Sequence, residues 1–99
     1  MTEVCLNLLA SPELEEKLLD RLLLHPNVSV FVSQRAASHG GHIGDLDQTE
    51  QVLGRGDAVL IRALLTAVDA ESLVAELRIA FAHSGVMFWI VPILAKGAL

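Results

Sequence analysis

The 99-residue sequence predicts one α+β domain, residues 1–99, with the element order β-α-β-β-α-β. Three observations support this prediction. Four segments alternate apolar and polar residues, or run apolar, over the length of a strand. Two others place apolar residues three and four apart, as on one face of a helix. The polar stretch of residues 38–56, which joins the second strand to the third, is far longer than an ordinary connection of about 4–6 residues.

The first half of the chain predicts a strand, a helix and a second strand. In residues 2–10, alternation gives one face to four apolar residues, Val4, Leu6, Leu8 and Ala10. The helix is expected to begin with Ser11 as N-cap and Pro12 in its first turn, and to end before Pro26. Its apolar stripe is Leu14, Leu18 and Leu22, flanked by Leu19 and Leu23. The second strand, residues 28–37, divides into Val28, Val30 and Val32 on one face and Ser29, Phe31, Ser33 and Arg35 on the other.

The second half repeats the order strand, helix, strand. From Asp57, the faces of the third strand are Val59, Ile61, Ala63 and Leu65 against Ala58, Leu60, Arg62 and Leu64. The second helix is expected to begin at Asp69 as N-cap and to close at Ser84-Gly85. Its apolar face is Leu73, Val74, Leu77, Ala80 and Phe81. The last strand covers residues 86–94, and Pro92 near its end favours an edge position or a bulge.

This element order is that of ferredoxin-like domains, in which two helices cover one face of a four-stranded antiparallel sheet. The opposite face of such a sheet is normally polar, but here Leu60 and Leu64 lie on it, and residues 87–91 are apolar on both faces. The composition, 53% hydrophobic and 19% charged, agrees with extensive burial. We therefore expect a second subunit to cover this face.

Charge and apolar run length exclude two classes of partner. The net charge is −5 and no cluster of lysine or arginine occurs, so nucleic-acid binding is not expected. The longest unbroken apolar run, residues 86–91, is far shorter than the roughly 20 residues of a spanning helix, so membrane insertion is not expected. The absence of a basic, apolar leader and the single cysteine favour the cytoplasm.

A family resemblance rests on four segments that occur in order: SPELEEKLLD, HGG, TEQVLGRG and FWIVPIL. Together they resemble a small PII-like family of uncharacterised proteins. The topology is also similar to that of PII signalling proteins and of CutA-type divalent-cation-tolerance proteins. The resemblance implies a homotrimer with a regulatory or sensor function. In such a protein, residues 38–56 would respond to a small ligand or metal ion and contact a partner protein.

Residues 38–56 also hold the candidate metal ligands. His39 and His42 flank two glycines, Gly40 and Gly41, which let the backbone bend so that both rings reach one ion. Asp45, Asp47 and Glu50 could each supply an oxygen ligand, and Asp45 is the one assigned. The ion would be a transition metal such as Zn, Cu or Ni. The alternative is that both histidines are solvated in a glycine-rich turn.

Other candidates have two interpretations each. Arg55, between two glycines, is placed to present its guanidinium to a carboxylate or phosphate of a ligand or partner, or else to pair with Glu50 or Asp57. Cys5 is expected to be a small buried hydrophobe rather than a ligand. His25 and His83 are expected to cap helix C-termini.

No arrangement of nucleophile, base and acid is convincing, so we assign no catalytic residue, no organic cofactor site and no enzymatic activity. Two further functions stay open beside the sensor. One is a soluble protein that buffers or confers tolerance to a transition metal through the loop histidines. The other is a structural interaction module without a ligand.

Overall fold

The computed structural model describes residues 2–40 and 56–99 of the chain. Its elements are β1 (Glu3–Ala10), a short 3₁₀ turn η1 (Pro12–Leu14), α1 (Glu15–Leu24), β2 (Val30–Ser38), β3 (Gly56–Thr66), α3 (Ala67–Ala80) and β4 (Met87–Pro92). The strands form one antiparallel sheet in the order β2-β3-β1-β4. The predicted ferredoxin-like α+β fold is confirmed.

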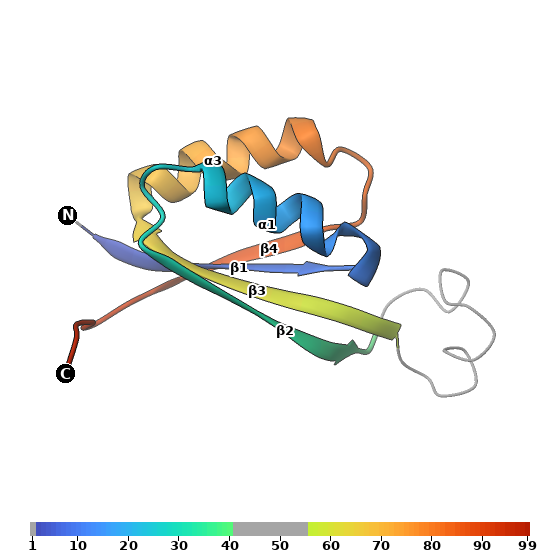
Figure 1. Ribbon diagram of the computed structural model, residues 1–99, viewed down its shortest axis with the longest axis horizontal. Coiled ribbons are helices and arrows are strands. Elements are labelled where there is room, and N and C mark those ends of the chain that lie inside the picture. The colour runs from blue at the N-terminus through green and yellow to red at the C-terminus, as the bar shows by residue number, and fades with distance from the viewer. Residues whose placement is uncertain (1, 41–55) are drawn as a thin grey trace.

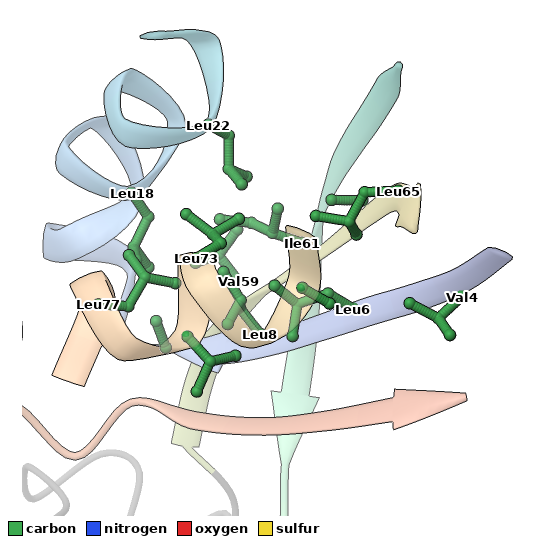
Figure 2. Close-up of a cluster of buried hydrophobic side chains, with 14 residues drawn as sticks. Val4, Leu6, Leu8, Leu18, Leu22, Val59, Ile61, Leu65, Leu73 and Leu77 are labelled. Atoms are coloured by element: carbon green, nitrogen blue, oxygen red, sulfur yellow. The ribbon is translucent and has the colours of Figure 1, made fainter. Parts of the chain in front are cut away.

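Helices α1 and α3 lie on one face of the sheet, and within residues 2–40 and 56–99 no helix lies on the other face (Figure 1). The core fills the space between these layers, where side chains of the central strands β1 and β3 meet those of α1 and α3 (Figure 2). Its fully buried members include Leu6, Leu18, Ile61 and Leu73, each at 0% exposure. Burial of one such side chain stabilises the fold by about 1.5–3 kcal/mol.

The alternation predicted for the two central strands is confirmed. Val4, Leu6, Leu8 and Ala10 of β1, and Val59, Ile61, Ala63 and Leu65 of β3, all belong to the buried core. On β2 the core-facing side chain is Phe31, whereas Val30 and Val32 are about half exposed on the opposite face. Arg35 of β2 reaches α1, where its Nη2 lies 3.4 Å from Oε1 of Glu15.

Helix α1 begins later than predicted. Ser11 does precede the first turn, but that turn is 3₁₀, and the α-helix starts at Glu15. The Ser11 hydroxyl lies 3.3 Å from Oε1 of Glu13 and caps no backbone N–H. Leu18 and Leu22 are buried as expected, but Leu23 is 72% exposed, so the predicted stripe is too wide by one residue.

Helix α3 begins and ends earlier than predicted. Its N-cap is Thr66, not Asp69: the Thr66 Oγ1 accepts a hydrogen bond from the Asp69 N–H at 3.2 Å and donates to Oδ2 of Asp69 at 2.9 Å. The helix ends at Ala80, which is exposed rather than buried, and a turn leads from there into β4. Gly85 lies in that turn with φ +83°.

The edge strand β4 ends at Pro92, as the missing proline N–H predicts. Beyond it the Ile93 N–H donates to the Glu3 carbonyl at 3.1 Å, and the Lys96 ammonium lies 3.6 Å from Oε1 of Glu3. Over the described ranges, no helix has the length and apolar character needed to cross a membrane.

Candidate functional site

The sheet face without helices, here called the bare face, is built from rows of side chains that run across all four strands. The register places Val30, Leu64, Cys5 and Val91 in one row. The next row is Val32, Arg62, Asn7 and Trp89, and the third is Gln34, Leu60, Leu9 and Met87. Eight of these twelve residues are aliphatic or aromatic side chains, so the bare face is predominantly apolar.

Large side chains at both margins of the bare face are accessible. Val30 on β2 is 51% exposed, and Met87 on β4 is 60% exposed. Trp89, in the middle row of β4, is 41% exposed. Contiguous exposed apolar surface of this kind marks an interaction surface on a folded protein.

Polar groups occupy the middle of the bare face. The Arg62 Nη1 donates to Oε1 of Gln34 at 2.9 Å. Asn7 is 5% exposed, and its Nδ2 lies 3.3 Å from the Cys5 carbonyl and 3.5 Å from the Trp89 carbonyl. The partner of the Arg62 guanidinium is therefore a neutral amide. A subunit that packs on this face therefore has to accommodate the Arg62 guanidinium, held by Gln34, beside apolar side chains.

The base of the long connection is held by the ladder between β2 and β3, which runs as far as Ser38 opposite Gly56. The Ser38 Oγ lies 3.4 Å from the Gly56 carbonyl. The two ends of residues 38–56 are thus fixed side by side at one end of the sheet. Exposed His39 follows directly after β2, and Gly40 has φ +85°, a conformation that glycine adopts readily.

Of the predicted site residues, only His39 and Gly40 lie in the part of the chain that the structure describes. Gly41, His42, Asp45 and Arg55 lie outside it. Within residues 2–40 and 56–99, no group of three or more histidine, cysteine, aspartate or glutamate side chains is close enough to hold a metal ion.

The two remaining histidines and the cysteine belong to three different parts of the fold. His25 is the C-cap residue of α1, and its Nδ1 accepts a hydrogen bond from the Asn27 N–H at 3.3 Å. His83 follows α3 and has φ +60°. Cys5 is half-buried on the bare face, between Leu64 and Val91.

A groove that sequence reasoning missed lies on the helix side of the sheet, between the last turn of α3 and β4. It has a volume of about 350 Å³. Its apolar lining comes from α3, from the strands β1 and β4, and from the turn between α3 and β4, namely Leu8, Val74, Leu77, Phe81, Ala82, Val86 and Phe88. Arg78 and His83 also line it. No local sequence pattern predicts this groove, because the groove depends on how far α3 extends over the sheet.

The fold is similar to that of three proteins of known structure. A DUF3240 family protein from Shewanella baltica OS155 has a TM-score of 0.82 at 20% identity, over 100% of this chain and 98% of its own. The second is CPII from Thiomonas intermedia K12, a nitrogen regulatory PII-like protein bound to ADP, AMP and bicarbonate. Its TM-score is 0.75 at 13% identity, and the match covers 100% of this chain and 98% of CPII. The periplasmic divalent cation tolerance protein CutA from Archaeoglobus fulgidus has a TM-score of 0.71 at 12% identity. The match covers 95% of this chain and 86% of CutA.

At these identities the three structures establish the fold, which is that of PII-like and CutA-type proteins. No curated protein sequence matches the chain significantly. The family model, in contrast, matches from the first residue to the last. Residues 1–99 match DUF3240, described as a protein of unknown function, and the chain belongs to this family.

Proposed function

We propose that this protein is a cytoplasmic, non-enzymatic regulatory protein of PII-like type. It assembles as a homotrimer, and residues 38–56 bind a small ligand or a metal ion and contact a partner protein. The observation that carries the proposal is the bare face. It is a largely apolar surface, and the helices α1 and α3 both lie on the other side of the sheet (Figure 1).

The bare face supports assembly on energetic grounds. Removing apolar surface from water contributes roughly 25 cal/mol per Å², and each of the four strands contributes apolar side chains to this face. A closed cyclic arrangement of identical subunits covers such a surface and leaves no further apolar surface exposed for additional chains to bind. The likeness to PII-like proteins favours three-fold symmetry.

The position of residues 38–56 supports a regulatory role. Their ends leave β2 and β3, and β3 contributes Leu60, Arg62 and Leu64 to the bare face. A ligand bound by residues 38–56 would therefore act on strands that also form the subunit interface. Long connections held on a rigid scaffold are the usual place for binding residues.

The mass of the assembly tests this proposal directly. Light scattering coupled to gel filtration should give three times the 10.7 kDa mass of one chain. Leu64→Glu places a carboxylate between Val30 and Cys5 on the bare face, and we expect it to dissociate or precipitate the protein. Glu16→Lys on the exposed side of α1 is the control and should keep the wild-type mass. A wild-type mass of one chain at micromolar concentration would contradict the proposal.

Metal binding is the second candidate function, and two observations favour it. His39 is exposed at the end of β2, where residues 38–56 begin. One structural neighbour is a divalent cation tolerance protein. In this version of the function, His39 and His42 bind a Zn, Cu or Ni ion, with Asp45 as an oxygen ligand.

Calorimetric titration with Zn²⁺, Cu²⁺ and Ni²⁺ separates the metal-binding function from the sensor of an organic ligand. Replacing both histidines, His39→Ala with His42→Ala, should abolish binding of the ion and change the thermal midpoint little. The variant His25→Ala is the control and should bind as the wild type does. Undiminished binding by the double variant would exclude these histidines as the ligands.

A further inference from the structure

The groove between α3 and β4 exists because α3 covers the centre of the sheet but not its edge. The helix packs on β1 and β3, and β4 lies beyond them at the edge. Phe88 and Ile90 of β4 point to the helix side of the sheet, yet they stay 40% and 39% exposed. In the neighbouring strand, Leu6 and Leu8 on the same face are 0% and 2% exposed. The groove is therefore an apolar slot with no helix over its β4 wall.

The rim of the groove carries positive charge. The Arg78 guanidinium lies over the Phe88 ring, with its Cζ 5.2 Å from the ring centroid, so it spans from α3 to β4. Such a cation–π contact holds the guanidinium in place. Its N–H groups lie in the guanidinium plane and can still donate hydrogen bonds to a ligand. Among the described residues, no carboxylate pairs with Arg78, and none lines the groove.

A second donor lies on the same rim. His83 is exposed, and its φ of +60° is uncommon for a residue other than glycine. The turn that holds it is fixed by Ser84, whose Oγ bonds to the Phe81 carbonyl and accepts from the Val86 N–H at 3.3 Å. An imidazole donates at least one N–H in each of its protonation states. The groove thus combines an apolar interior with two donors at its mouth.

We propose that this groove binds a small organic anion in which an apolar body carries one carboxylate. The body lies between α3 and β4 against Val74, Leu77 and Phe88, and the carboxylate binds to Arg78 and His83. A volume of about 350 Å³ is within the usual range of small-molecule sites. Charge complementarity selects an anion, and the planar guanidinium fork matches a carboxylate. The groove lies on the helix side, so the proposal is independent of assembly through the bare face.

Octanoate is a suitable probe, with 1-octanol as its uncharged counterpart of equal chain length. Titration of ¹⁵N-labelled protein should show saturable octanoate binding that shifts the amides of Leu77, Ala82, His83 and Val86. 1-Octanol should bind about tenfold more weakly because it cannot form the charged hydrogen bonds. Absence of saturable octanoate binding, or shifts confined to the bare face, would overturn the proposal.

Two variants and a control sharpen the test. Arg78→Gln should weaken octanoate binding about tenfold and leave 1-octanol binding unchanged, because it removes the charge but keeps a helix-forming side chain. Ala82→Trp fills the groove from an exposed position and should abolish binding of both probes. Arg35→Gln makes the same charge change on β2, at the opposite edge of the sheet from β4, and should have no effect. Equal octanoate affinity in Arg78→Gln and Arg35→Gln would contradict the assigned role of Arg78.

Discussion

At the residue scale, the junction between β3 and α3 depends on one hydroxyl group. Thr66 is the last residue of β3 and also the N-cap of α3, with φ −75° and ψ 159°. Its Oγ1 accepts a hydrogen bond from the Asp69 N–H and donates one to Oδ2 of Asp69. Asp69 in turn accepts a hydrogen bond from Nδ2 of Asn27 at 3.2 Å, which links the start of α3 to the segment before β2.

Removing this cap should destabilise the protein by about 1 kcal/mol, because Thr66→Ala leaves an N–H of the first helical turn without its partner. Urea unfolding followed by circular dichroism measures the change as a lower midpoint at unchanged slope. Thr2→Ala, on an exposed threonine outside the helices, is the matched control. Equal midpoints for the two variants would show that the cap contributes nothing measurable.

The sequence is informative about the central strands and less so about helix ends. Period-two alternation places Leu6 and Ile61 in the core without ambiguity, because every second side chain of a strand shares a face. Both Thr66 and Asp69 are good N-cap residues, and only the end of β3 decides between them. Leu23 is exposed because α1 buries only the side chains that point at the sheet, which are those of Leu18 and Leu22.

At the element scale, the turn from α3 to β4 requires a left-handed backbone at Gly85. A Cβ built on Gly85 meets no atom within 4 Å, so the only obstacle to a side chain there is φ +83°. The same turn positions His83 and Val86 at the groove. Its conformation thus affects both the entry into the edge strand and the shape of the groove.

We expect Gly85→Ala to destabilise the fold by roughly 1–2 kcal/mol, the cost of a left-handed conformation for an alanine. Thermal unfolding measures this as a lower midpoint. Gly97→Ala is the matched control, because Gly97 also has open space at its Cβ but no positive φ. If the two variants have the same midpoint, the turn relaxes without cost and Gly85 is not required.

The candidate site was only partly predictable from the elements. Amphipathic patterns indicated an apolar second face, because Leu60 and Leu64 alternate with core residues on β3. The groove could not be predicted, because Arg78 and Phe88 belong to different elements and meet only once α3 lies over β1 and β3. All the proposed metal ligands stay a prediction from sequence, because His42 and Asp45, which would complete the site with His39, lie outside the described residues.

At the scale of the whole molecule, the single tryptophan is a reporter for the bare face. Trp89 is 41% exposed in one chain and stands in the same row as Asn7 and Arg62. A subunit that covers the bare face removes this indole from water. The sequence contains no second tryptophan, so its emission is unambiguous.

The wild-type protein should therefore emit at shorter wavelength than Leu64→Glu, and dilution should shift the wild-type emission toward that of the variant. Fluorescence measured over a concentration series checks this, with light scattering on the same samples. Glu16→Lys should follow the wild type at every concentration. Identical emission of wild type and Leu64→Glu, with both chains folded, would place Trp89 outside any interface.

The strand order also bears on how a ribosome-bound chain folds. β1 lies between β3 and β4, so one of its edges stays unpaired until the final six-residue strand has emerged. The ladder that closes this edge pairs Val4 with Pro92 and Leu9 with Met87, which joins opposite ends of the sequence. Contacts so distant along the chain form late. Synthesis interrupted before β4 would thus release a sheet whose central apolar strand is an open template for pairing with other chains.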